Sequence, residues 1–403
     1  MSESAAHLVD QVFPHVPVRQ WVLSFPMSVR FILARHPRLQ SKALSIVHRG
    51  IATYLRKKAK CQDLDDLKGP CKPGAVTLIQ RFGGSLNLNV HFHMLFLEGA
   101  YFATPDGPRF YAVPPPTDEE VKRLVRSLAK RVVQMLKKQG YFCEDEEAGA
   151  FSEQDQGNFL SEIQAASVQS KVALGERKHQ RVRGLGAVLS GDAMPELKGR
   201  LCAQVNGFSL HAAVACEQGE KEKLEKLCRY ITRPAVAEER LSLTPSGQVV
   251  LRLKRAYSNG TSHLLFSGIE FVEKLAALVP PPRIHLTRYF GCLAPHSKIR
   301  AEIVPKPKNG AEQGACEHAC QALHQTTHET TRATPSKLKW AELLARVFSI
   351  DMKHCSSCGG ELKILAAILE TDAIHKILTH LDLPFRPPDI APAVLPAQME
   401  MEF

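Results

Sequence analysis

The clearest pattern in the chain is an unbroken alternation of apolar and polar side chains over residues 86–94. A period of two is typical of a β-strand with one face in a core. The apolar positions are Leu86, Leu88, Val90, Phe92 and Met94, and the polar positions are Asn87, Asn89, His91 and His93. A second predicted strand at 75–82 precedes this one, and Gly83-Gly84 between them indicates a β-hairpin.

Hydrophobic periodicity predicts the remaining elements of the chain. Further strands are expected at 20–26, near 108–113, and at 207–215, 247–255 and 261–267. Helices are expected at 28–36, 39–58, 117–140, 219–232 and 268–279. Because the strands are scattered among helices without a regular βα repeat, the predicted fold class is α+β, with an antiparallel sheet and flanking helices.

Shifts in composition divide the chain into a large domain and a small one. Residues 1–302 are expected to form the main domain, with a helical insertion at 117–200. Residues 303–336 lack apolar periodicity, which predicts a linker. A small C-terminal module with a Pro-rich tail is expected at 337–403.

Charge and composition narrow the functional class. The 403 residues include 52 Lys and Arg against 41 Asp and Glu, a net charge of +11, which favours a nucleic acid over a membrane as partner. A mildly basic enzyme without a polyanionic partner is the alternative. The chain has no apolar run that could span a bilayer, and Met1–His7 lacks the layout of a secretory signal, so we expect a cytoplasmic protein.

His91 and His93 lie two positions apart on the predicted strand, so both imidazoles point the same way and could hold one cation. If the hairpin turns at Gly83-Gly84, Gln80 shares a face with Asn87, and Gln80 or Asn89 becomes a candidate third ligand. Two exposed strand histidines are the alternative interpretation.

The helix predicted at 219–232 carries a candidate nucleophile. Its apolar face consists of Leu224, Leu227, Cys228 and Ile231. Tyr230 lies off that face, and the cationic residues around it are Lys226, Arg229 and Arg233. Cations stabilise a phenolate and grip a phosphate, which a tyrosine attacking a phosphodiester would need. An amphipathic tyrosine at a helix edge is the alternative.

Cys355 and Cys358 form a Cys-x-x-Cys-Gly-Gly element that is typical of a zinc knuckle. The element supplies two ligands, and candidates for the others are His354 and the cluster of Cys316, His318 and Cys320. Two reduced cysteines on a turn are the alternative interpretation.

Together these residues resemble a known family. His91-Phe92-His93 with Tyr230 resembles the HUH endonucleases. The segments "VPVRQWVLSFP", "TLIQRFGGSLNLNVHFHMLFLEG", "RYITRP" and "IDMKHCSSCGG" resemble the rolling-circle transposases of the insertion-sequence ninety-one group, which includes the ISCR-like enzymes. The resemblance runs from about residue 1 to 395. It implies an HUH-type sheet, Mg²⁺ or Mn²⁺ as cofactor, and nicking and joining of single-stranded DNA through a 5′-phosphotyrosine. A two-imidazole site would suit zinc equally well.

The chain departs from that family in three places. Related enzymes have a Tyr-x-x-Lys-Tyr-x-x-Lys frame, and here Lys226 occupies the place of the first tyrosine. Family members usually carry a Cys-rich zinc-binding region ahead of the segment that opens this chain, and one interpretation is that Met1 is an internal start. Tyr289, next to Arg288, is an alternative nucleophile to the preferred Tyr230.

We therefore expect a DNA transposase in which His91 and His93 hold the metal ion and Tyr230 attacks the phosphodiester. Arg229 and Arg233 would position the phosphates. The alternatives are a catalytically inactive DNA-binding remnant and a plasmid-type replication initiator or relaxase. A homodimer is a further expectation.

Overall fold

The structure is a computed structural model of the chain. It describes residues 2–60, 71–141, 159–185, 199–257, 259–305, 340–348, 350–355, 358–363, 368 and 370–383. Among the helices in these ranges, none is both long and apolar enough to cross a membrane.

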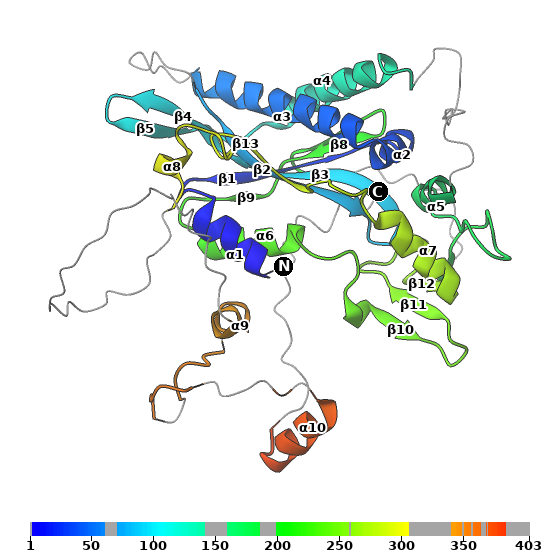
Figure 1. Ribbon diagram of the computed structural model, residues 1–403. Helices are drawn as coiled ribbons and strands as arrows, with labels where there is room; N and C mark the ends of the chain where they lie inside the picture. The colour runs from blue at the N-terminus through cyan, green and yellow to red at the C-terminus, as the bar shows by residue number, and fades with distance from the viewer. Residues whose placement is uncertain are drawn as a thin grey trace, which may run out of the picture.

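A seven-stranded antiparallel sheet forms the centre of the molecule (Figure 1). Its strand order is β13-β2-β3-β1-β8-β7, and β9 pairs with β1. The strands are β1 (Val18–Ser24), β2 (Gly74–Phe82), β3 (Leu88–Leu97), β7 (Cys202–Val205), β8 (Phe208–His211), β9 (Ala215–Cys216) and β13 (Thr287–Gly291). This sheet with flanking helices confirms the predicted α+β class.

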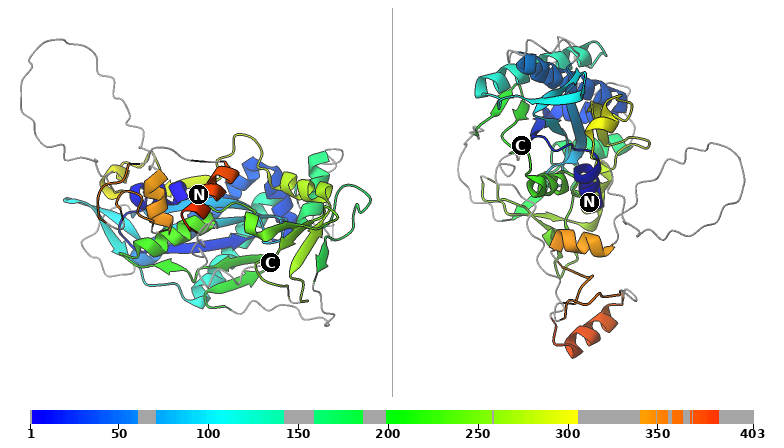
Figure 2. Two further views of the ribbon diagram at one scale, coloured as in Figure 1. Left: turned by 90° about the horizontal axis from the view of Figure 1, so that it is seen from below. Right: turned by 90° about the vertical axis from the view of Figure 1, so that its left-hand side faces the viewer.

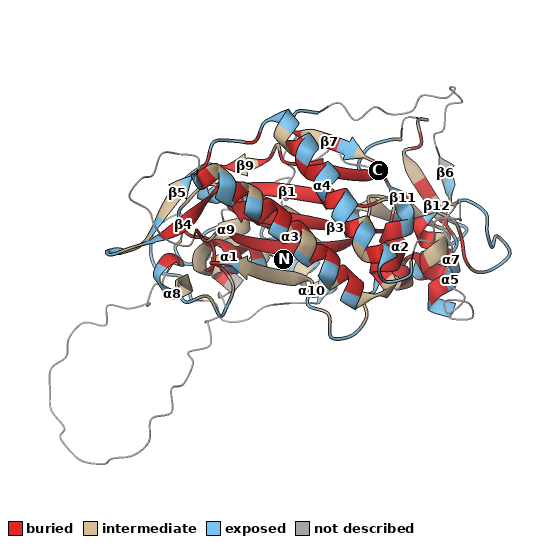
Figure 3. Ribbon diagram, turned by 90° about the horizontal axis from the view of Figure 1, so that it is seen from above, coloured by how far each residue is buried: buried red, intermediate tan, exposed pale blue. Residues whose placement is uncertain are grey.

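Helices cover both faces of the central sheet (Figure 2). On one side lie α2 (Met27–Arg35), α3 (Pro37–Lys60) and α4 (Asp118–Lys137), and on the other lie α1 (Ser2–Gln11) and α6 (Lys221–Ile231). Val90, Phe92 and Met94 of β3 are fully buried in the cluster formed with α2, α3 and α4. Figure 3 shows β1 and β3 almost entirely buried beneath this layer. The predicted alternation is therefore confirmed, and its polar face points toward the side of α1 and α6.

The β2–β3 hairpin turns at Gly83-Gly84, as predicted. A Cβ at Gly83 would lie 2.3 Å from Oδ1 of Asn87, so glycine leaves room for the Asn87 side chain in the turn. The strand begins at Leu88 and not at Leu86, because Leu86 has a φ of 59° and belongs to the turn.

A smaller four-stranded sheet lies beside the central one, and we call it the side sheet (Figure 1). Its strands, in order, are β10 (Leu241–Leu243), β11 (Val249–Arg252), β12 (His263–Phe266) and β6 (Arg183–Leu185). Helices α5 (Phe159–Val168) and α7 (Gly268–Leu278) pack against each other next to it. The 3₁₀ turn η2 (Glu238–Arg240) leads into β10.

The remaining elements are the β4–β5 hairpin (Gly99–Thr104 and Gly107–Ala112), α8 (Arg300–Ile303), α9 (Trp340–Phe348) and α10 (Thr371–His380). Within the segment predicted as an insertion, α4 packs along α3 and contributes Val121, Leu128 and Val132 to the core. Of the predicted linker, residues 306–336 lie outside the described ranges. In the C-terminal module, Arg346 of α9 forms ion pairs with Asp10 of α1 and Glu225 of α6.

His48 of α3 should make the fold sensitive to acid. Its ring stacks on Phe96 and Phe290 at 5.2 and 4.2 Å between centroids, and its Nε2 atom is buried without a hydrogen-bond partner. Burial, with a contribution from Arg56, lowers the pKa of His48 to about 4. The unfolded chain takes up a proton at this residue near pH 6.5, whereas the folded chain does not, so stability falls as the pH drops from 6.5 toward 4.

Between pH 7 and 4.5, we therefore expect the free energy of unfolding to fall less in His48→Phe than in wild type, by on the order of 2 kcal/mol, because one pKa unit corresponds to about 1.4 kcal/mol. The phenyl ring keeps the stack and cannot be protonated. Denaturant unfolding at both pH values measures the effect. An equal loss of stability in wild type and variant would show that His48 does not cause the sensitivity.

Candidate active site

His91 and His93 lie side by side on β3, with ring centroids 4.9 Å apart. Strand pairing places other polar side chains on the same face, because residues directly opposite in an antiparallel ladder point the same way. His91 pairs with Gln80 of β2 and with Ser24 of β1. Val22 of β1 pairs with His93 on one side and with His211 of β8 on the other.

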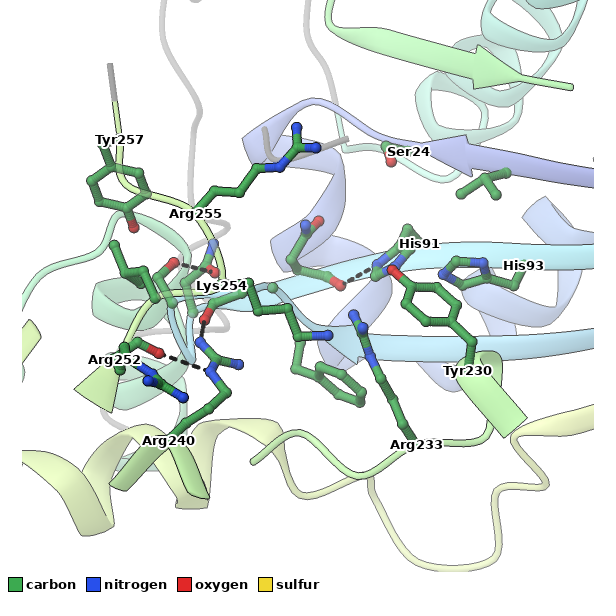
Figure 4. A pocket seen from close by; sticks show the side chains of 18 of the residues that line it. Ser24, His91, His93, Tyr230, Arg233, Arg240, Arg252, Lys254, Arg255 and Tyr257 are labelled. Carbon is green, nitrogen blue, oxygen red and sulfur yellow. Dashed lines mark hydrogen bonds between the residues drawn. The ribbon is translucent and has the colours of Figure 1, made fainter. Parts of the chain in front are cut away.

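These strands form one wall of a cavity of about 500 Å³ (Figure 4). His91, His93 and His211 line this wall, Tyr230 and Arg233 come from α6 and the turn after it, and the side sheet closes the remaining side. His93 is only 5% exposed. His91, His93 and the predicted nucleophile Tyr230, distant in sequence, therefore line a single cavity, whereas Gln80 is not among its lining residues.

Tyr230 is directed to the cavity by the amphipathic pattern of α6. Leu224, Leu227, Cys228 and Ile231 are buried, as predicted, and hold the helix against the sheet. Tyr230 lies at the edge of that face, with its ring centroid 6.5 Å from that of His93. The Arg233 guanidinium carbon is 4.2 Å, and the Lys254 ammonium 5.5 Å, from the centroid of the Tyr230 ring. Both cations would stabilise negative charge developing on the tyrosine oxygen.

The other residues singled out on α6 lie elsewhere. Lys226 is exposed and lines a separate depression with Arg346. Arg229 is half-buried, and its Nε atom is buried without a hydrogen-bond partner, but the residue does not line the cavity. Of the three predicted DNA-binding residues, Arg233 is the one that the fold brings to Tyr230.

Tyr289, the alternative nucleophile, lies on β13 and lines a different pocket, together with residues of α1 such as His7. Burial raises the pKa of Tyr289, although Arg300 opposes the shift. Its phenol is therefore harder to ionise than a free one, and the structure does not bring it into the cavity with the histidines.

His211 and the cationic residues of the side sheet were not predicted from the sequence. The lining of the cavity includes Arg240, Arg252, Lys254 and Arg255 in addition to Arg233, and none of the described lining residues is Asp or Glu. The run Lys254-Arg255-Ala256-Tyr257 was a visible basic and aromatic signal, but only the tertiary structure places it beside Tyr230. An excess of positive charge in a cleft is suited to a phosphodiester.

The histidine pair has properties that suit a metal ion. Burial, with the charges of Arg30 and Arg233, lowers the pKa of His91 to about 4, and burial lowers the pKa of His93 well below its usual range. Both rings are therefore neutral near pH 7, the state in which imidazole binds a metal. Nδ1 of His91 lies 2.9 Å from the Asn89 carbonyl oxygen, to which it can donate, leaving Nε2 as the ligand atom.

Among the described residues, no group of three or more His, Cys, Asp or Glu is arranged to hold a metal ion. The two candidate third ligands, Gln80 and Asn89, are both amides. Oε1 of Gln80 and Oδ1 of Asn89 are both buried without a hydrogen-bond partner. Gln80 lies directly opposite His91, and its Nε2 donates to the Ile231 carbonyl at 2.7 Å. The amide is thus held with its oxygen available, which fits the candidate role of Gln80.

Gln20 orients the second histidine. Its Nε2 lies 2.7 Å from Nδ1 of His93. In this orientation Gln20 donates to Nδ1, and the proton of neutral His93 lies on Nε2. Binding of a metal through Nε2 would require the amide of Gln20 to rotate so that its oxygen accepts from Nδ1.

The two candidate zinc ligands of the C-terminal module lie on a tight turn. The Cys355 amide donates to the Gly360 carbonyl, and the Gly359 amide donates to the Cys355 carbonyl, both at 2.8 Å. His354 pairs with Asp351 at 2.9 Å. The cluster of Cys316, His318 and Cys320 lies outside the described residues.

Comparison with known proteins agrees with the character of the cavity. The model of the Y2_Tnp family, described as "Putative transposase", matches residues 74–301, more than half of the chain. The matched region contains β2, β3, α6 and the side sheet. Neither the curated proteins nor the solved structures gave a match. With a match of this extent enclosing the histidine pair, Tyr230 and the cationic lining, the chain belongs to the Y2_Tnp family of transposases.

Proposed function

We propose that this transposase nicks and rejoins single-stranded DNA by a rolling-circle mechanism, as an HUH-type enzyme of the insertion-sequence ninety-one group. The observation that supports this most is the position of Tyr230. Its ring lies beside the His93 ring in a cavity whose charged lining residues are cationic. A tyrosine next to a metal-binding pair and surrounded by cations is arranged for attack on a phosphodiester.

In the proposed step, Oη of Tyr230 attacks the scissile phosphorus in line with the leaving 3′ oxygen. The bond from Oη to phosphorus forms and the bond from phosphorus to O3′ breaks. The phenol proton is released and the departing O3′ takes up a proton. Rejoining reverses the step, because a 3′-hydroxyl attacks the 5′-phosphotyrosine and frees Tyr230. Arg233 and Lys254 would stabilise the negative charge in both directions.

His91, His93 and Gln80 are the residues proposed to hold Mg²⁺ or Mn²⁺. When bound, the ion would neutralise charge on the scissile phosphate and fix its orientation. The α6 backbone contributes to the same arrangement, since the Ile231 carbonyl holds the Gln80 amide in place.

A pool of random single-stranded oligonucleotides tests the proposal without knowledge of the target sequence. With Mn²⁺, a 3′-labelled pool should give labelled protein on a denaturing gel, whereas a 5′-labelled pool should not, because the 5′-phosphate of the downstream fragment stays on the tyrosine. Labelling from the 5′-labelled pool would contradict the stated polarity. DNA binding without any adduct would favour the inactive remnant.

We also propose that the C-terminal module binds zinc through Cys355 and Cys358. A domain this small gains stability from a metal, and the Cys-x-x-Cys turn offers two ligands. Full-length protein should contain zinc that the double variant Cys355→Ser, Cys358→Ser lacks, as measured by elemental analysis. Equal zinc content in both proteins would identify the two cysteines as ordinary thiols.

A further inference from the structure

The proposed reaction uses only one end of the cavity. Figure 4 shows Tyr230, His91 and His93 gathered at that end and Tyr257, Arg252 and Arg240 at the other, with Lys254 between them. Every one of these distal residues comes from the side sheet or its loops. Apart from Lys254, whose ammonium lies near the Tyr230 ring, these distal residues have no part in the proposed reaction.

The distal end is fixed to the rest of the site by Arg240. Its Nε donates to the Arg252 carbonyl, and one of its terminal nitrogens donates to the Gly84 carbonyl, each at 2.8 Å. The end of β11 is thus tied to the turn of the hairpin that carries His91. The side sheet therefore keeps a set position relative to the histidine pair.

Strand alternation explains why cations line this end. Buried and exposed positions alternate here. Leu251 and Leu253 are buried in the core, whereas Arg252 and Lys254 are exposed and line the cavity. Arg255 follows, and its side chain extends across the cavity toward Ser24 (Figure 4).

Tyr257 is held in the loop that follows. Its amide donates to the Thr261 carbonyl, and its own carbonyl accepts from the Gly260 amide, both at 2.8 Å. This turn keeps the half-buried ring at the cavity wall. An aromatic ring next to a row of cations is the combination that binds single strands, because the cations follow the phosphates while the ring stacks on a base.

We propose that Arg252, Lys254, Arg255 and Tyr257 form a subsite for a nucleotide that flanks the scissile phosphate in single-stranded DNA. The three cations bind its phosphates and Tyr257 stacks on its base. The inference rests on the proposed function, since it takes the strand at Tyr230 to be the substrate. It adds which part of the fold holds the strand and by which contacts.

Binding measured without divalent ions, and therefore without nicking, tests the subsite separately from catalysis. The probes are a fluorescent oligothymidylate and an oligonucleotide of equal length made entirely of abasic residues. Tyr257→Ala should weaken binding of the oligothymidylate about tenfold, because a stacked base contributes about that much, and should leave binding of the abasic strand unchanged. Tyr257→Phe keeps the ring and should bind both as wild type does.

Unchanged abasic binding also shows that Tyr257→Ala remains folded. Equal oligothymidylate affinity of Tyr257→Ala and wild type would overturn the stacking role. An equal loss of oligothymidylate affinity in Tyr257→Phe and Tyr257→Ala would also overturn the stacking role, because that result would assign the effect to the hydroxyl group.

The cationic part has a matched control. Arg252, Lys254 and Arg255 are exposed, so their replacement by Gln should leave the fold intact. The triple variant should bind both probes more weakly than wild type. The slope of log affinity against log salt concentration should become shallower by about 2, because each of the three lost phosphate contacts contributes roughly 0.7. The control replaces Lys122, Arg123 and Arg126 by Gln; these are exposed on α4, across the central sheet.

If the salt dependence of DNA binding had the same slope in the two triple variants, the proposed subsite would be contradicted. If the wild-type protein bound single-stranded DNA but formed no covalent adduct, that result would contradict only the proposed reaction. The two outcomes are therefore distinguishable.

Discussion

Replacing Tyr230 by phenylalanine is expected to abolish the covalent protein–DNA adduct, a loss on the order of 10⁴-fold or more, because the attacking atom is removed. The change deletes one oxygen and keeps the ring, so the contacts with Arg233 and the packing against the buried apolar residues of α6 and its neighbours should persist. DNA affinity and melting temperature should stay near those of wild type. The measurement is the yield of labelled protein from the 3′-labelled oligonucleotide pool.

Tyr289→Phe is the matched control for this experiment. The two variants lose the same atom, but Tyr289 lies in a separate pocket and burial raises the pKa of its phenol. The control should form adduct at the wild-type level. A full adduct yield in Tyr230→Phe, mapped by peptide sequencing to Tyr289 or Tyr257, would show that Tyr230 is not the nucleophile.

The double variant His91→Ala, His93→Ala is expected to lose Mn²⁺ binding and metal-dependent nicking together. Loss of an outer-shell partner typically costs 10–100-fold in metal affinity, and removal of two direct ligands should cost more than that. Calorimetric titration of Mn²⁺ measures binding without relying on activity. Gln80→Ala should show a smaller loss of affinity if its unpaired oxygen is the third ligand.

The pH dependence of Mn²⁺ binding provides a second readout for this site. Because the pKa of His91 lies at about 4, protons should compete with the metal at His91 only as the pH falls toward 4, and affinity should persist at pH 5.5. Exposed histidines with ordinary pKa values would already have lost affinity there. Wild-type affinity in the double variant, or in His91→Ala alone, would place the ligands elsewhere.

Local patterns in the sequence predicted most of the individual elements. The helices expected at 28–36, 39–58, 219–232 and 268–279 correspond to α2, α3, α6 and α7 within a few residues. Helical and strand periodicities depend on neighbours in sequence, so they can be recognised without the fold. The β4–β5 hairpin was only half anticipated: a strand was expected near 108–113 but none at Gly99–Thr104.

The register of Gln80 could not be obtained in the same way. It depends on the loop length and on the irregularity between Gln80 and Phe82, which together place Gln80 opposite His91. A shift of one residue would have turned its side chain to the other face of the sheet. The sequence offered Gln80 as a candidate ligand, but only strand pairing shows which face of the sheet its side chain occupies.

Two features of the site can be recognised from the sequence alone: two histidines share one strand face, and Tyr230 lies at the edge of an amphipathic helix. These facts follow from side-chain periods of two and of about 3.6 residues. Three further features depend on the three-dimensional fold: α6 crosses this face of the sheet, His211 joins it from β8, and cations of the side sheet complete the cavity. These contacts join residues far apart in the chain, and their formation depends on how whole elements bury their apolar faces against one another, which no local pattern encodes.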